Sequence, residues 1–215
     1  MLSHPHPPKE EKTLNATIWD RIEESRRRWN VLEHPFYQRW SEGELTQSEL
    51  ARYSGQYRHA VEAIATLSAA AASALPERDE LRTHAAEELG HIRLWDGFVE
   101  AVGGETDADP TAETTDCVSD WAGDGEAVEL LARLYAVEAS QPAISRTKRA
   151  GLIERYGFSE GSGTAYFRIH EGRDVEHAAE VRELISELAS DEDADRIVAA
   201  AESAYEANWR LLDGV

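Results

Sequence analysis

The sequence predicts an all-α protein, and three observations support that class. Helical hydrophobic periodicity recurs almost from end to end, no segment shows the alternation expected of a strand, and no internal repeat is present. A chain of 215 residues suits one domain with a sizeable core. We expect one helical domain over residues 13–215, preceded by a disordered, proline-rich tail over residues 1–12.

Caps and breakers divide the first half of the chain. The first helix is expected over residues 14–40, interrupted near Pro35, because the residue before a proline is driven away from helical geometry. A capping box, Thr46-x-x-Glu49, opens the second helix, which ends near Leu75.

The middle of the chain contains two more helices. Pro76 suits the first turn of the third helix, which ends at the glycine pair 103–104. A polar stretch with a short helical piece follows, and the fourth helix is expected over residues 124–156, where Pro142 must kink it.

The last two helices follow a glycine-rich loop at residues 161–164. That loop has neither the lysine of a P-loop nor a preceding strand, so we interpret it as the start of the fifth helix, which extends to about Leu188. A last helix begins near Glu192.

Charge and composition exclude several classes of function. Forty-two acidic residues against 22 basic ones give a formal net charge of -20, which repels nucleic acid and anionic lipid. Only three of the basic residues are lysines, and such an acid-rich surface resembles that of proteins adapted to concentrated salt. The single cysteine excludes an internal disulfide, and no signal peptide or membrane span is evident, so we expect a cytoplasmic protein.

Polar residues with metal-binding side chains occupy the core-facing stripe of the fifth helix. His170, Asp174 and His177 lie at i, i+4 and i+7 and therefore share one face. The same stripe continues with apolar residues, namely Val181, Leu184 and Leu188.

Two other helices repeat this pattern. In the third helix His84, Glu88 and His91 precede aromatic core positions at the same spacing, and in the fourth helix a leucine stripe leads to Glu138. Burying an unpaired carboxylate costs several kcal/mol, so these inward groups need a shared solution.

Two bound transition-metal ions would provide that solution. Inward carboxylates with Glu-x-x-His, here Glu88 and His91, are how helical bundles hold dinuclear iron or manganese. Imidazole and carboxylate ligands favour Fe with Mn as the alternative, and the absence of clustered thiols disfavours structural zinc. Pro142 cannot donate to the carbonyl of Glu138, so the expected kink falls at a predicted ligand.

Several neighbouring residues have more than one interpretation. His84 is a ligand, a partner of a ligand or a hydrogen-bonded core histidine, and Glu62, beside His59, is an extra ligand or a member of an ion pair. Glu87 is interpreted as a solvated acid. Cys117 lies in an acidic loop without a basic neighbour, which disfavours a reactive thiol.

Six segments, spread over nearly the whole chain, resemble the CADD-like branch of the TenA/PqqC superfamily. They are HPFYQRW (34–40), QYRHAVEA (56–63), EELGHIRLW (87–95), YAVEASQPAISRTKRAGL (135–152), YFRIHEGRDVEH (166–177) and the ending WRLLDGV. The resemblance implies a haem-oxygenase-like seven-helix bundle that encloses two metal ions, usually Fe with Fe or Mn, and uses O2 and a reductant. It also implies a homodimer.

By motif, the resemblance implies a set of metal ligands drawn from three helices: Glu88, His91, Glu138, His170, Asp174 and His177. The third helix departs from the pattern. CADD-like proteins often separate the acid and the histidine by six residues, and here that spacing selects His84 instead of an acid.

CADD-like proteins are associated with making para-aminobenzoate for folate by oxidative cleavage of one of their own tyrosines, with a lysine supplying the amine. Lys148 matches that lysine, ten residues after Glu138, and it continues the inward stripe of the fourth helix. The candidate tyrosine is Tyr37, followed by Tyr53 and Tyr57.

Two other activities of the superfamily are alternatives. TenA-type hydrolysis of a thiamin pyrimidine needs no metal but requires a cysteine nucleophile, which the position of Cys117 disfavours. Cofactor-free oxidation of the PqqC type remains an analogy at the level of the fold. A non-enzymatic adaptor would leave the inward acids unexplained.

Overall fold

The computed structural model describes residues 9–215, with side chains from residue 17 onward. The described part contains eight α-helices, two short 3-10 helices and no strand, which confirms the all-α class. The α-helices are α1 (Lys9–Arg28), α2 (Pro35–Glu42), α3 (Gln47–Ala74), α4 (Asp79–Val102), α5 (Ala112–Trp121), α6 (Ala127–Glu154), α7 (Ser162–Leu188) and α8 (Ala194–Asp213). The 3-10 helices are η1 (Val31–Glu33) and η2 (Asp191–Asp193).

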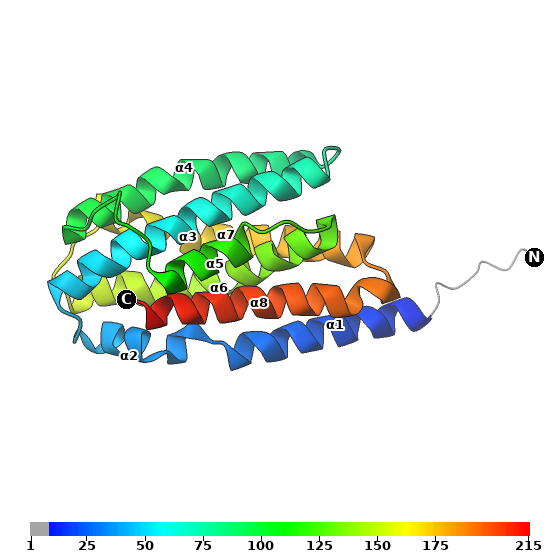
Figure 1. The fold of residues 1–215 in the computed structure, drawn as a ribbon, viewed down its shortest axis with the longest axis horizontal. Helices are drawn as coiled ribbons and strands as arrows, with labels where there is room; N and C mark the ends of the chain where they lie inside the picture. Colours follow the sequence, from blue (N-terminus) through cyan, green and yellow to red (C-terminus); the bar gives the residue numbers. More distant parts are fainter. Residues whose placement is uncertain (1–8) are drawn as a thin grey trace, which may run out of the picture.

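The helices form an elongated bundle with α6 and α7 at its centre (Figure 1). α3 and α4 form a hairpin along one side, and α1 and α8 lie side by side along the other. α5 packs against α3 and α8, while α4 and α6 both pack against α7. Residues on the inner faces of α4, α6 and α7 are therefore brought together.

Local signals explain most of the helix boundaries. The capping box is confirmed: Thr46 Oγ1 accepts from the Glu49 N–H at 3.2 Å, and Glu49 accepts from the Thr46 N–H at 2.7 Å. The first predicted helix is divided into α1 and α2, since His34 Nδ1 accepts from the Phe36 N–H at 3.1 Å and caps a new helix that begins at Pro35.

Two boundary predictions differ from the structure. Pro76 does not begin α4; it lies in a tight turn closed by the Arg78 N–H to the Leu75 carbonyl at 3.0 Å, which reverses the chain between α3 and α4. α1 starts at Lys9 and so includes the end of the predicted tail, while residues 1–8 lie outside the described residues. α6 continues through Pro142, and the kink there stays a prediction.

A close contact between α2 and α6 holds α6 in place. Trp40 Nε1 donates to the Lys148 carbonyl at 3.1 Å. A Cβ on Gly151 would meet the Trp40 ring at 2.6 Å, so only glycine leaves room for the indole there. The contact anchors the segment of α6 that carries Lys148.

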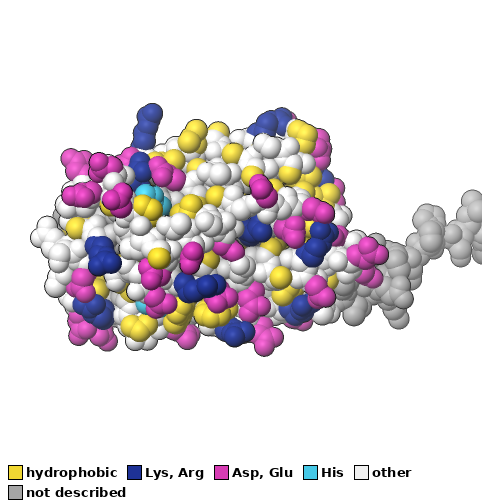
Figure 2. All heavy atoms as spheres, viewed as in Figure 1, with side chains coloured by type: hydrophobic (Ala, Val, Ile, Leu, Met, Phe, Trp, Pro, Cys, Tyr) yellow, Lys and Arg dark blue, Asp and Glu magenta, His cyan; other side chains and the backbone are white. Residues whose placement is uncertain are grey.

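Acidic side chains are spread over the face of the molecule that Figure 2 shows. Many of them pair with the arginines, as in the bidentate contact of Arg173 with Glu87. No helix of the described part combines the length and the apolar character that crossing a membrane requires.

Candidate metal centre

Three helices direct acids and imidazoles into one buried region. α4 contributes His84, Glu88 and His91, α6 contributes Glu138, and α7 contributes His170, Asp174 and His177. None of these residues is more than 8 % exposed, so the inward orientation expected from the helical spacing is confirmed. Within the described residues, their ligand atoms form two groups compact enough for a metal ion.

The first group consists of Glu88, His91 and His170, whose ligand atoms lie within 4.8 Å of one another. His91 Nδ1 lies 3.0 Å from Glu88 Oε1. His170 Nδ1 lies 2.6 Å from the Tyr166 carbonyl oxygen, which can only accept, so Nδ1 carries the proton and donates. His170 Nε2 is left with a lone pair and no hydrogen-bond partner, and burial lowers the pKa of His170 to about 4.

The second group consists of His84, Glu88, Glu138 and His177. The rings of His84 and His177 stack with their centroids 3.8 Å apart, and His84 Nε2 touches Glu138 Oε1 without forming a hydrogen bond. His177 Nδ1 lies 3.9 Å from Glu88 Oε1 and 3.8 Å from Glu138 Oε1, also without a hydrogen bond. Glu88 belongs to both groups, so its carboxylate would be shared if each group held an ion.

Asp174 lies beside these groups but in neither of them. Its side chain is 1 % exposed, and neither carboxyl oxygen has a hydrogen-bond partner. Burial raises the pKa of Asp174 well above its usual value, and the charges of Glu138 and Glu88 raise it further. The pKa of Glu138 is raised for the same reasons, burial first and then the charge of Glu88.

Cations explain this arrangement well. The atoms without a hydrogen-bond partner are Nε2 of His170, Nδ1 of His177, both ring nitrogens of His84 and all four carboxyl oxygens of Glu138 and Asp174. Buried polar atoms without a partner are costly, and bound ions would satisfy several of them at once. Because the donors are imidazole nitrogens and carboxylate oxygens without a thiolate, the set suits iron or manganese.

Three residues near the centre were missed or left open by sequence reasoning. His84, which had three interpretations, lies inside the second group. Glu87 is not a free solvated acid: its Oε2 lies 3.1 Å from His177 Nε2 and 2.7 Å from Arg173 Nε. The ring of Tyr166 stacks on that of His170 with their centroids 3.8 Å apart, and the Tyr166 hydroxyl has no hydrogen-bond partner. The i+4 spacing from Tyr166 to His170 could have indicated this last contact.

Lys148 lies inside the bundle in a cage of aromatic rings. It is fully buried, its Nζ has no hydrogen-bond partner, and the nearest ring centroid is that of Tyr57 at 4.3 Å. Four further rings lie between 5.2 and 5.6 Å from Nζ, those of Tyr53, Trp95, Tyr37 and Phe167. Burial alone lowers the pKa of Lys148 well below its usual value, which favours the neutral amine.

The three candidate tyrosines surround this amine. The hydroxyls of Tyr37 and Tyr53 lie 3.1 Å apart, and Gln141 Nε2 donates to the Tyr57 hydroxyl at 2.9 Å. Burial raises the pKa of each phenol, so all three are neutral at ordinary pH.

The remaining candidates lie outside the centre. Glu62 forms an ion pair with Arg58 at 2.6 Å, and His59 Nε2 lies 2.8 Å from the Ala108 carbonyl oxygen. Cys117 lies in α5 instead of a loop and is 1 % exposed. Burial, with the charge of Asp120, raises the pKa of its thiol, so the residue is a poor nucleophile for TenA-type hydrolysis.

Comparison with known proteins also points to an iron enzyme. Residues 51–209 match the model of a family described as iron-containing redox enzyme. A 4-aminobenzoate synthase of Chlamydia muridarum is 31% identical, over 94% of this chain and 91% of that protein. Proteins of the same name from Chlamydia trachomatis serovar D and Nitrosomonas europaea are 34% and 30% identical, covering 86% of this chain and 85% of each relative.

Solved structures support the haem-oxygenase-like fold. A TenA homologue from Pseudomonas syringae pv. tomato superposes with a TM-score of 0.78 at 18% identity, over 99% of this chain and 97% of that one. A CADD-like protein of unknown function from Nostoc punctiforme superposes with a TM-score of 0.75 at 19% identity, over 96% and 97% of the two chains. The chain therefore has the fold of the TenA homologue and the CADD-like protein, and it belongs to the family of iron-containing redox enzymes.

Proposed function

We propose that this protein is an O2-dependent dimetal oxygenase that makes 4-aminobenzoate from one of its own tyrosines. The observation that carries the proposal is the pair of buried ligand groups that share Glu88, together with a buried, unpaired lysine in a cage of tyrosines. The three similar proteins described above, all 4-aminobenzoate synthases, supply the product.

The proposed ligands are those of the two groups and Asp174. They are His84, Glu88, His91, Glu138, His170, Asp174 and His177. Two bound ions, iron with manganese as the alternative, would supply the redox chemistry that activates O2 with electrons from a reductant. His170 Nε2 and His177 Nδ1 offer lone pairs, and Glu138 and Asp174 would release protons as an ion binds.

Lys148 is the proposed source of the amino group. A neutral amine has the lone pair that forming a carbon–nitrogen bond requires, and the lowered pKa of Lys148 supports that state. Tyr37 is the proposed ring donor, with Tyr53 and Tyr57 as the alternatives in contact with the same amine. The cage excludes water from both reacting groups.

Isotope labelling tests the nitrogen source. Protein grown with 15N-lysine, loaded with Fe or Fe and Mn and given reductant and O2, should release 15N-labelled 4-aminobenzoate, measured by mass spectrometry. Lys148→Arg should abolish the product. Lys9 and Lys12 are the other two lysines of the chain, so the double variant Lys9→Arg/Lys12→Arg is the matched control and should retain it. Unlabelled product, or product from Lys148→Arg, would contradict the role of Lys148.

The setting of the enzyme is part of the proposal. We expect a homodimer in the cytoplasm, on the basis of the family resemblance and of the single, buried cysteine. The net charge of -20 supports a protein that does not bind nucleic acid.

A further inference from the structure

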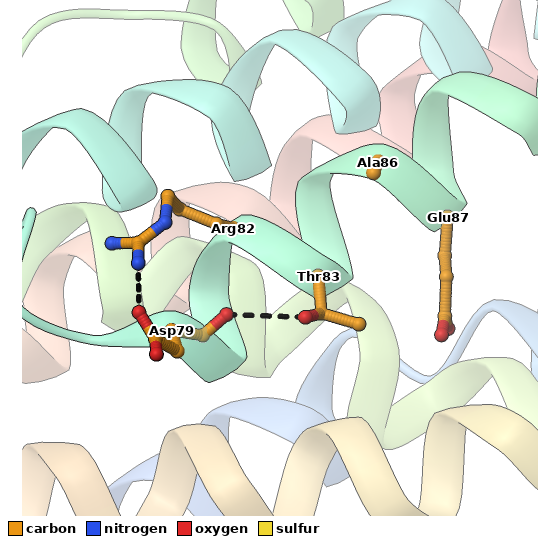
Figure 3. Close-up of a pocket in the computed structure, with 5 residues that line it drawn as sticks. All are labelled: Asp79, Arg82, Thr83, Ala86 and Glu87. Atoms are coloured by element: carbon orange, nitrogen blue, oxygen red, sulfur yellow. Dashed lines mark hydrogen bonds and ion pairs between the residues drawn. The ribbon is translucent and has the colours of Figure 1, made fainter.

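Glu87 connects the molecular surface to the buried centre. Its side chain is 33% exposed, whereas that of His177 is 1% exposed, and Glu87 Oε2 lies 3.1 Å from His177 Nε2. Figure 3 shows Glu87 in the wall of an open surface hollow on α4, where it extends away from the paired side chains of Asp79 and Arg82. Glu87 therefore takes no part in the Asp79–Arg82 ion pair and instead contacts Arg173 and His177 of α7.

Arg173 holds Glu87 in this orientation. Arg173 Nε donates to Glu87 Oε2 at 2.7 Å, and Arg173 Nη2 donates to Glu87 Oε1 at 2.8 Å. Such a two-pronged contact restrains the carboxylate plane as well as its distance. Arg173 Nη1 also pairs with Glu176.

The contact determines which nitrogen of His177 faces the centre. An ionised carboxylate can only accept, so His177 Nε2 carries the proton and Nδ1 keeps its lone pair. His177 Nδ1 lies 3.8 Å from Glu138 Oε1 and has no hydrogen-bond partner. Turning the ring over would break the Glu87 contact and put the Cδ2–H in place of the Nδ1 lone pair at the second group.

In the first group, the imidazole of His170 has no comparable charge behind it. His170 Nδ1 donates to the neutral backbone carbonyl of Tyr166 at 2.6 Å, which no side-chain substitution removes. A carboxylate behind an imidazole makes the ring a stronger donor to a metal than a carbonyl does. The two groups therefore differ although both contain histidine and Glu88.

We propose that Glu87 is a positioning residue that orients His177 toward the second group and strengthens the binding of only one of the two ions. The inference rests on the proposed function, because it needs ions at both groups. It adds that the two positions are inequivalent, and that the difference depends on one partly exposed acid held by Arg173.

The test is anaerobic titration with Mn2+, following free Mn2+ by its EPR signal, for the full chain and its variants. Glu87→Ala should weaken one of two binding steps by about 10–100-fold and leave the other unchanged. Glu87→Gln keeps an acceptor of the same size, so it should give a smaller loss at the same step and tests the inference even if the alanine variant folds poorly. Glu183→Ala, which removes an exposed acid on α7, is the matched control and should bind as the unmodified protein does.

A double-variant cycle separates positioning from a general structural effect. If Glu87 acts through His177, adding Glu87→Ala to His177→Ala should cause no further loss of Mn2+ affinity. Additive losses, or two unchanged binding steps in Glu87→Ala and Glu87→Gln, would overturn the inference and leave the proposed function standing. An unmodified protein that binds no ion would overturn both.

Discussion

At the residue scale, Lys148 is a cost to stability. Because its pKa is lowered in the folded state, the unfolded chain binds a proton that the native protein does not, and stability rises with pH until the ordinary lysine value of 10.5 is passed. We expect Lys148→Met to raise the free energy of unfolding by roughly 2–4 kcal/mol near pH 7 while abolishing 4-aminobenzoate formation. Denaturant unfolding checks the first effect.

The pH dependence provides the control for this prediction. The advantage of Lys148→Met should shrink as the pH approaches 10.5, since the unfolded lysine then becomes neutral as well. Arg146→Met, an exposed cation on the same helix, should change stability little at any pH. A Lys148→Met protein that is less stable than the original near pH 7 would mean that packing in the aromatic cage outweighs the charge.

At the element scale, α6 contains both a proposed metal ligand, Glu138, and a helix-breaking proline, Pro142. Pro142 lacks the N–H that would bond the Glu138 carbonyl, and a proline inside a helix costs about 3 kcal/mol. We expect Pro142→Ala to raise the free energy of unfolding by about 1–3 kcal/mol and to weaken ion binding, because the restored bond moves Glu138 relative to α4 and α7. Ser140→Ala, also on α6, should do neither. Unchanged ion affinity in Pro142→Ala would show that Glu138 does not depend on the proline.

At the scale of the whole molecule, the centre joins three helices, and its acids and histidines respond to pH in opposite directions. Glu138 and Asp174 have raised pKa values, so their contribution to stability is present at low pH and is lost as the pH rises through those values. His170 and His177 have pKa values lowered to about 4, so their contribution is present above 6.5 and is lost as the pH falls toward about 4.

Bound ions should therefore stabilise the bundle more at higher pH. An ion replaces the protons on Glu138 and Asp174, so Mn2+ affinity should increase from about pH 6 to about pH 8. The gain in melting temperature on adding Mn2+ should increase in parallel, reaching the equivalent of about 2.7 kcal/mol at 100 times the dissociation constant. Calorimetry with and without a chelator measures both, and Glu138→Gln should flatten the pH dependence. A gain that is independent of pH would contradict the assignment of these two acids.

The net charge of -20 leads to a separate prediction about salt. Raising KCl from about 0.1 M to about 1 M shortens the screening length from about 10 Å to about 3 Å, which weakens repulsion among the carboxylates. We expect the melting temperature to rise over this range, although the surface ion pairs are screened too. Sucrose at equal osmolality is the control for excluded-solute effects, and a falling melting temperature in KCl would contradict adaptation to salt.

The sequence alone determined the class of fold, most helix boundaries and the stripes that face the interior. These depend on spacing and capping within one helix, as the Thr46 capping box and the 4-3 spacing of His170, Asp174 and His177 illustrate. Pro76 was misjudged because the reversal between α3 and α4, which is not a property of either helix, decides where α4 begins.

Only the tertiary structure decided how residues of different helices meet. It grouped His84 with Glu138 and His177, left Asp174 beside both groups, and turned Glu87 from a solvent-facing acid into the partner of His177. Spacing along a helix determines which face of that helix a side chain lies on. Whether two side chains touch depends on the rotation and separation of packed helices, which the whole core sets at once.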